Sequence, residues 1–530
     1  MEYLGIPFSV KNVPCLQPDF LPFAPWRTAY LSQARQPFRI AVEGSGTVVY
    51  ETRIRGGSPA DLRYLERTIK LLLWSVGGWR VTLQGDEVLI SRLRESFSPH
   101  GSRAFDVAMM ETVYGRPFCV EAAEERFPEP RPAARPIGGH LEGCRIGFDA
   151  GGSDRKVSAV VDGRTVYSEE VVWHPKTAAD PRYHQREVLC ALRTAAAHLP
   201  RVDAIGVSTA GIVRGDELMV SALLAAVPPE RQQEGRTLYR RAAAAMGNVP
   251  LAVANDGDVT ALAGYMSLGT GPVMGIAMGT SQAAGYVDAQ GRVSGWLNEL
   301  AFAPVDLAEA APRDPWSGDT GVGGQYFSQD AVIRLAAAAG VPTDAALTPA
   351  QQLQQVQELA RQGHPAARRI FRDMGVCLAH TLALYAEIYP LRHVMVLGRV
   401  ASGIGGEWMT ETCRRVLAEE YPQLPLEVRT IASAASDSPW PPPVFRRCAR
   451  NAAIPESADF SERCVPVGTP CSMRCPAKWC TLPSRTPCQM GRLTKCGTVP
   501  CEVACQMTYP INREFPFFCS APVARRQTIE

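Results

Sequence analysis

The chain has 530 residues, of which 46% are hydrophobic and 20% are charged, a composition that excludes a disordered or fibrous protein. Single hydrophobic cores stop growing at roughly 250–300 residues, so we expect roughly two to four domains. The 55 basic and 53 acidic residues give a net charge of +2, which excludes a strong overall attraction to nucleic acid or to an anionic membrane and favours a small-molecule partner.

Residues 1–136 predict a small α+β domain that ends in a linker. Strand-like runs cover residues 38–42 and 81–84, and an amphipathic helix covers residues 61–74. Residues 127–136 are rich in Pro and Arg, which leaves too few apolar residues for a core. The domain lacks the pattern of a helix-turn-helix, so we expect no nucleic-acid partner. Its role stays open between simple packing, oligomerisation as a homodimer, and a lid over a cleft.

Residues 137–270 and 271–432 predict two related α/β lobes, because short Val- and Ile-rich strands alternate with glycine turns and amphipathic helices. In the first lobe we expect strands at 145–149, 157–161, 166–172, 202–208 and 251–255, and helices at 182–198 and 258–268. In the second we expect strands at 273–278, 284–287 and 393–397, and helices at 329–339, 349–362, 365–388 and 407–419.

The first motif that can carry chemistry is a strand that ends at Asp149 and runs into Gly151, Gly152 and Ser153. Adjacent glycines let backbone N–H groups approach phosphate oxygens, the serine adds a hydroxyl donor, and the aspartate can hold a hydrated Mg²⁺. These groups suit nucleotide phosphates. The alternative is a tight hairpin turn, which Gly-Gly-Ser also forms.

The second motif places Asn255 and Asp256 where a strand ends and a helix begins. A carboxylate held there can accept the proton of a substrate hydroxyl, and the neighbouring amide can bind a second hydroxyl. Asp256 is therefore the candidate general base. The alternative is helix capping, because Asn and Asp are both preferred at helix N-termini.

Two further glycine turns follow buried strands. Gly279 and Thr280 suggest a second phosphate-binding turn facing the first, with a polar hairpin as the alternative. Gly398 and Gly403 lie in a strand-to-helix turn where a flat base or ribose can rest against the backbone.

In order and spacing these four motifs resemble those of the ROK family of repressors, open reading frames and sugar kinases. The family's patterns are D-x-G-G-T, N-D-x-x-x-A-A-x-x-E, G-T-G-x-G-G-G and V-L-G-G-G-x-S, and the matching segments lie within residues 143–432. Residues 208–213, Ser-Thr-Ala-Gly-Ile-Val, resemble the family's G-x-P-G-x-V segment. The resemblance implies a two-lobed α/β core of the actin/hexokinase-like, or ribonuclease H-like, type.

The resemblance also implies the roles of individual residues. Asp256 would be the catalytic base, and Asn255 and Glu299 would bind sugar hydroxyls. Adenosine would lie near Gly398 and Gly403. The phosphates of ATP and a Mg²⁺ ion would lie near Asp149, Gly151, Gly152, Ser153, Gly279 and Thr280. The implied partners are a small sugar and a nucleotide, and the implied reaction is in-line transfer of the γ-phosphoryl group of ATP to a sugar hydroxyl.

The sequence departs from the family at two places beside the expected sugar. The family's G-E-I-G-H is Asn-Glu-Leu-Ala-Phe at residues 298–302, and its C-x-C-G-x-x-G-C zinc loop is replaced by residues 317–326, which contain neither Cys nor His. We therefore expect no structural zinc and infer no glucose specificity. Ser281, Gln282 and Ala283 replace a run of glycines in the family's third motif, so the alternative is a catalytically degenerate sugar-binding or regulatory protein. A third hypothesis is an ATPase of the wider actin and heat-shock superfamily.

Residues 433–530 predict an irregular tail. Ten of the 16 cysteines lie between residues 448 and 519, among Pro and Arg without a sustained period, at spacings unlike those of common zinc sites. The abrupt change suggests a shift of reading frame near residue 433. The cysteine distribution, the lack of a leader-like start at Met1 and the lack of a stretch of roughly 18 apolar residues lead us to expect a cytoplasmic protein with no membrane partner.

Overall fold

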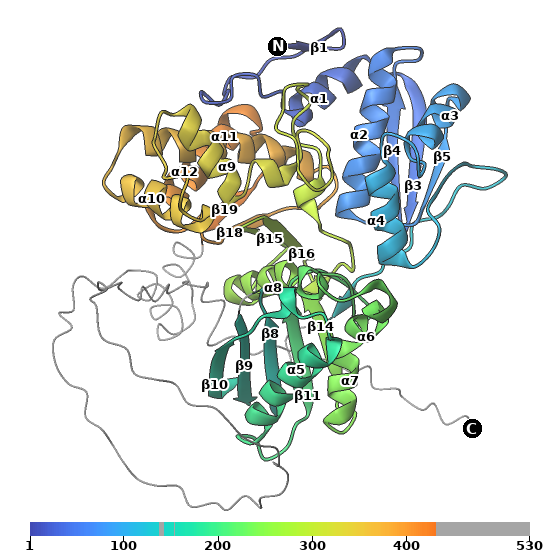
Figure 1. Ribbon diagram of the computed structural model, residues 1–530. Helices are drawn as coiled ribbons and strands as arrows, with labels where there is room; N and C mark the ends of the chain where they lie inside the picture. Colours follow the sequence, from blue (N-terminus) through green and yellow to red (C-terminus); the bar gives the residue numbers. More distant parts are fainter. Residues whose placement is uncertain (137–141, 153, 431–530) are drawn as a thin grey trace, which may run out of the picture. The chain divides into compact units, whose positions relative to one another are not determined.

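The computed structural model describes residues 1–136, 142–152 and 154–430, all of which belong to one compact unit of the chain (Figure 1). Ser153 and the tail at 433–530, with its suggested frame shift, lie outside these residues. None of the helices within them combines the length and the hydropathy that a bilayer crossing requires.

The N-terminal region is built around a four-stranded sheet of order β4-β3-β5-β6. Its central helix α2, Pro59–Ser75, begins with a capping box in which Ser58 and Asp61 each accept a backbone N–H. The strands are β3 (Gln36–Glu43), β4 (Thr47–Ile54), β5 (Arg80–Gln84) and β6 (Cys119–Ala122), with a separate hairpin of β1 (Glu2–Tyr3) and β2 (Ile6–Pro7). The other helices are α1 (Phe23–Gln33), α3 (Glu87–Ser96) and α4 (Ala104–Tyr114).

The first lobe is a five-stranded sheet of order β10-β9-β8-β11-β14. Its first three strands form an antiparallel meander, and β11 and β14 then add parallel to β8. The strands are β8 (Cys144–Ala150), β9 (Asp154–Val161), β10 (Arg164–Val172), β11 (Ala204–Thr209) and β14 (Leu251–Asn255), with a hairpin of β12 (Ile212–Arg214) and β13 (Glu217–Val220). The helices are α5 (Pro181–Ala196), α6 (Gln232–Arg236) and α7 (Leu238–Ala245), and α5 and α7 pack against each other beside the sheet (Figure 1).

The second lobe repeats this strand order. Its sheet runs β19-β18-β15-β16-β17-β7, with an antiparallel meander of β15, β16 and β17 and parallel additions of β18 and β19. The strands are β15 (Val273–Met278), β16 (Gln282–Val287), β17 (Arg292–Val293), β18 (His393–Leu397) and β19 (Glu427–Thr430). The helices are α8 (Asp256–Leu268), which joins the lobes, α9 (Gln329–Ala338), α10 (Pro349–Arg361), α11 (Pro365–Tyr385) and α12 (Gly403–Glu420). The repeat confirms the predicted fold of two related lobes.

The segment expected to be a linker ends in a strand. Residues Arg135–Pro136 form β7, which pairs antiparallel with β17 and extends the second-lobe sheet by one strand. Arg131 also bridges to Thr47 at the start of β4. The Pro-rich composition did not reveal this pairing, because a proline at the edge of a sheet need not donate a hydrogen bond.

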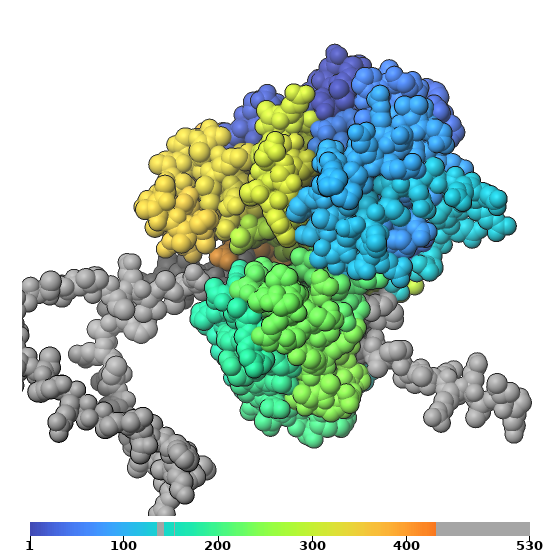
Figure 2. Space-filling view, turned by 45° about the vertical axis from the view of Figure 1, so that its right-hand side comes forward, coloured from blue at the N-terminus to red at the C-terminus, as the bar shows by residue number. Residues whose placement is uncertain are grey.

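The N-terminal region and the second lobe share one hydrophobic core, whereas the strands of the first lobe enclose a separate one. The Trp74 and Phe302 rings, from the two regions, have centroids 4.4 Å apart. Asp319, in the loop that stands where the family has zinc ligands, forms ion pairs with Arg67 at 2.6 Å, Arg103 at 2.7 Å and Lys70 at 3.3 Å. In Figure 2 the blue N-terminal residues and the yellow-green residues near 320 lie side by side.

Candidate active site

Asp149 stands at the carboxyl end of β8, in register with Ser208 of β11 and Ala254 of β14. Parallel strands present their carboxyl ends at the same edge of a sheet, so Asp149 and the residues that follow β14 meet there. The side chain is buried, which raises the pKa of its carboxyl group, while Lys156 on β9 opposes the rise. A carboxylate with this position suits a hydrated Mg²⁺ that shares its shell with phosphate oxygens.

Asn255 ends β14 and caps α8, as the capping alternative predicted. Its side-chain oxygen accepts the N–H of Gly257 at 2.7 Å, and its amide nitrogen donates to the carbonyl of Gly211 at 2.8 Å. The second contact fixes the amide against the Ser-Thr-Ala-Gly segment that resembles the family. The structure therefore assigns the cap to Asn255 and leaves Asp256 available for another role.

Asp256 is the first residue of α8 and is half-buried. The hydrogen bond recorded for its carboxylate comes from the N–H of Gly257, 3.0 Å away, which Asn255 already satisfies. Burial, followed by the negative charge of Asp149, raises the pKa of the Asp256 carboxyl group to about 6. A base with a pKa near the working pH is ionised and still binds a proton well, which suits proton transfer.

Glu299 stands at the start of the short 3₁₀ helix Leu300–Phe302 (η4), within range of the negative charge of Asp256. Burial, followed by the charges of Asp256 and Asp258, raises the pKa of its half-buried carboxyl group to about 8. Among the described residues, no hydrogen bond or ion pair engages this carboxyl group. Its oxygens are therefore available to hydroxyl groups of a ligand.

Asn298 positions this carboxylate cluster and was not predicted as a site residue. It is buried, has a left-handed backbone with φ of 54°, donates from its amide to Asp258 at 2.9 Å and accepts the Tyr389 hydroxyl at 2.9 Å. Its own N–H donates to the carbonyl of Ser75 at the end of α2. The family that the sequence resembles has a glycine at this position, which is consistent with a left-handed backbone. Asn is among the non-glycine residues that tolerate this conformation best. The contact with α2 had no signal in the sequence.

We expect Glu299→Gln to stabilise the protein at alkaline pH. The folded state raises the pKa of Glu299 from 4.5 to about 8, so it binds the proton more tightly than the unfolded chain, and stability declines as pH rises from about 4.5 to 8. Glutamine mimics the protonated acid and escapes this decline. The free energy of unfolding in urea should favour the variant by about 1–3 kcal/mol at pH 8.5 and by little at pH 5. The exposed Glu309→Gln is the matched control, and parallel pH curves for wild type and Glu299→Gln would contradict the assignment.

Two of the predicted glycine turns meet in the second lobe. Gly398, with φ of 99°, packs so closely on β15 that an added Cβ would lie 2.3 Å from the carbonyl oxygen of Met278, the residue before Gly279. Thr280 is exposed beside this contact, and Gly403 is exposed at the first residue of α12. The structure thus places these four predicted residues along one edge of the second sheet.

The turn at Gly151 and Gly152 belongs to the first lobe. Among the described residues, this turn does not contact Gly279 or Thr280. That the two turns face each other across a cleft therefore stays a prediction. The Trp173 indole donates to the carbonyl of Gly151 at 2.8 Å. The ammonium of Lys176 lies over the turn, 3.0 Å from where a Cβ on Gly152 would be. Lys176 is therefore a cation beside the expected phosphate site. The sequence motif did not indicate it, because Lys176 follows strand β10 and lies more than 20 residues after the glycines.

A cavity of about 560 Å³ opens beside the candidate base. Asn255 and Asp258, on either side of Asp256 in sequence, line it, whereas Asp256 itself is not among its lining residues. Other walls come from Trp296, from the β12–β13 hairpin, and from Ser45 and Ala133 of the N-terminal region. This volume falls within the roughly 300–1,000 Å³ typical of small-ligand sites.

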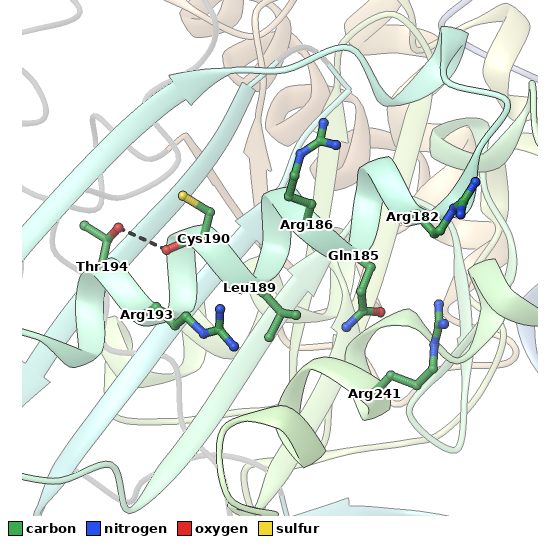
Figure 3. A pocket seen from close by; sticks show the side chains of 8 residues that line it. All are labelled: Arg182, Gln185, Arg186, Leu189, Cys190, Arg193, Thr194 and Arg241. Carbon is green, nitrogen blue, oxygen red and sulfur yellow. Dashed lines mark hydrogen bonds between the residues drawn. The ribbon is translucent and has the colours of Figure 1, made fainter. Parts of the chain in front are cut away.

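A second hollow, of about 550 Å³, lies along α5 and contains none of the predicted site residues (Figure 3). Arg182, Arg186 and Arg193 from α5 and Arg241 from α7 supply most of its charge. Arg182 is paired with Asp180, and Arg241 donates to the carbonyl of Glu234. In the described part of the chain, no group of three or more His, Cys, Asp or Glu side chains is arranged to hold a metal.

Comparison with known proteins finds similarity only among solved structures, since no family model and no curated protein matches the chain. It is 20% identical to a ROK hexokinase from Thermus thermophilus over 54% of this chain and 92% of that chain, with a TM-score of 0.42. It is 21% identical to a ROK family glucokinase from Streptomyces griseus, solved with glucose and AMPPNP, over 54% and 94%, with a TM-score of 0.40. A ROK family transcriptional regulator, a homolog of the E. coli MLC protein, is 18% identical over 55% and 74%, with a TM-score of 0.43. These three solved structures are ROK family proteins by their titles, while the strand order of the two sheets defines the fold of this chain independently of them.

Proposed function

We propose that this protein is a carbohydrate kinase that transfers the γ-phosphoryl group of ATP to a hydroxyl of a hexose or a related sugar. The observation that carries the proposal is Asp256, a half-buried carboxylate with a raised pKa at the carboxyl edge of the first-lobe sheet. Asn255 already satisfies the helix end, so a capping role does not account for Asp256. Its negative charge acts on Glu299, whose carboxyl oxygens have no hydrogen-bond or ion-pair partner among the described residues and are available for polyol hydroxyls.

In the proposed reaction Asp256 accepts the proton of the attacking hydroxyl while Asn255 and Glu299 orient the sugar. The turns at Gly151–Gly152 and Gly279–Thr280 would hold the phosphates, and the backbone at Gly398 and Gly403 would support the adenosine. Asp149 would hold Mg²⁺, which neutralises charge on the transferred group when bound. Asp149 and Lys176 flank the first of these turns, which supports this arrangement.

The alternative is a sugar-binding regulatory protein without catalysis. It is favoured by Ser281, just before β16, and Gln282, its first residue, which stand where the family that the sequence resembles has glycines.

An ADP-release assay on the full chain, with Mg·ATP and a panel of hexoses and amino sugars, tests the proposal. We expect turnover with at least one acceptor, decreasing as pH falls through about 6 because Asp256 becomes protonated. Thermal stabilisation by a sugar but not by Mg·ATP, without ADP release from any acceptor, would favour the regulatory alternative and reject the kinase.

A further inference from the structure

The β12–β13 hairpin places Arg214 in the wall of the cavity that Asn255 and Asp258 also line. The Arg214 side chain is half-buried. One guanidinium nitrogen donates to the carbonyl of Tyr114 at 3.1 Å, and the guanidinium lies 5.1 Å from the centre of the Tyr114 ring. Tyr114 ends helix α4, so the N-terminal region holds this arginine in place.

Arg214 stands opposite Glu217 in the β12–β13 hairpin, but the Glu217 carboxylate pairs with Arg240. Among the described residues, no carboxylate lies within ion-pair distance of its guanidinium, and one carbonyl and one ring leave most of its five N–H donors for a ligand. Arg240, in the same cavity, differs because it pairs with Glu217 at 2.6 Å and donates to the carbonyl of Gly215. A partly buried cation without a counter-charge is costly unless a ligand supplies one.

The other polar groups of the cavity are Ser45, the ion pair of Glu217 with Arg240, and Asn255 and Asp258 on either side of the candidate base in sequence. Asp258 accepts hydrogen bonds from Asn298 at 2.9 Å and from the backbone of Tyr286, so its negative charge is already engaged. Trp296 adds an aromatic wall that suits the C–H face of a sugar ring. The cavity therefore offers polar groups that can bind hydroxyls, at Asn255 and Asp258, and the planar guanidinium of Arg214. A guanidinium can bind a carboxylate or a phosphate through two parallel hydrogen bonds.

We infer that the acceptor is a sugar that carries an anionic group, and that Arg214 binds that group and sets the specificity. This inference rests on the proposed kinase function and adds to it the class of substrate. It also gives the N-terminal region a role, because Tyr114 holds Arg214 while Ser45 and Ala133 complete the cavity.

The test compares kcat/KM for ADP release by the full chain with neutral acceptors, D-glucose and N-acetyl-D-glucosamine, with the carboxylates D-glucuronate and D-gluconate, and with D-glucose 1-phosphate. We expect an anionic acceptor to be preferred, and the carboxylate and phosphate arms identify which anion it is. Arg214→Ala should lower the ratio of kcat/KM for the anionic over the neutral acceptors about 10- to 100-fold, since it removes hydrogen bonds to a charged group. Arg214→Lys should recover part of the loss, because it keeps the charge but not the fork.

Arg201→Ala is the matched control and should leave that ratio within about threefold, because Arg201 is an exposed arginine that is paired with Asp203 and does not line the cavity. A wild-type preference for neutral sugars, or an equal loss for all acceptors in Arg214→Ala, would overturn the inference. If no acceptor is phosphorylated, the kinase proposal fails, and calorimetric binding of glucuronate then decides about Arg214 separately. Binding that Arg214→Ala abolishes supports the anion site, and no binding of any anionic sugar to the wild type overturns it. Thermal denaturation of each variant shows that it is folded.

Discussion

Replacing Asp256 with asparagine is expected to abolish ADP release while leaving the fold and nucleotide binding intact. Loss of a positioned general base lowers kcat by about 10²–10⁴-fold. The substitution keeps the shape of the side chain and exchanges its charge for an amide, so it removes proton acceptance and little else. Steady-state kcat with the best acceptor measures the effect, and calorimetric titration with a nucleotide analogue measures binding.

Helix α8 should survive this change, because Asn255 caps it and the Asp256 carboxylate contributes only a redundant contact with the N–H of Gly257. Asp288→Asn is the matched control, because Asp288 forms its hydrogen bonds within the turn before Arg292, away from the cavity. A kcat for Asp256→Asn within a factor of three of the wild-type value would show that another group accepts the proton.

Replacing Asp319 with alanine is expected to destabilise the protein by about 3–5 kcal/mol, because it removes a carboxylate shared by three buried cations. Lys70 keeps Asp106 and Arg103 keeps Glu66, whereas Arg67 is left without an ion-pair partner among the described residues. Arg67, Lys70 and Arg103 all pair with this carboxylate, and their side chains are 2%, 1% and 9% exposed. These cations hold the pKa of Asp319 far below its usual value even though burial raises it. Urea unfolding followed by tryptophan fluorescence measures the loss.

Asp314→Ala provides the comparison within the same loop. Asp314 accepts hydrogen bonds from Ser317 and Gln325, both local, and pairs with none of the three cations. We expect it to cost about 1 kcal/mol, the usual contribution of hydrogen bonds of this kind. Equal losses for the two variants would show that the loop itself, and not the ion pairs with the N-terminal region, supplies the stability.

The two-lobed core was predictable because its signals are local. Strands β8, β11 and β14 are short apolar runs bounded by turn residues, and the structure places each within a few residues of its predicted range. Helix α8 begins at Asp256, two residues before the predicted start, and ends at Leu268 as predicted, with Gly269 following in a left-handed conformation. Asp149 and Asp256 were singled out because each stands at or just after the end of a predicted strand, whereas Glu299 was named only from the resemblance to the ROK family.

What the sequence did not reveal depends on contacts between distant segments. The pairing of β7 with β17 joins residues near 135 to residues near 292, and a two-residue strand has no periodicity to detect. Asn298 matters because its backbone contacts Ser75 and its side chain contacts Asp258. Arg214 became a candidate only when the structure showed which nearby arginine has a carboxylate partner and which does not. Neither propensity nor spacing encodes such relations.

The core shared by the N-terminal region and the second lobe has a consequence for synthesis on the ribosome. Trp74, Arg67 and Lys70 leave the ribosome long before Phe302 and Asp319, their partners in the finished fold. At roughly 5–20 residues per second, translation of the intervening segment takes on the order of 10–50 s. During that interval the nascent N-terminal region presents an unmatched aromatic surface, and Arg67 lacks the carboxylate that it pairs with in the finished fold, which makes the region a natural client for chaperones that act during translation.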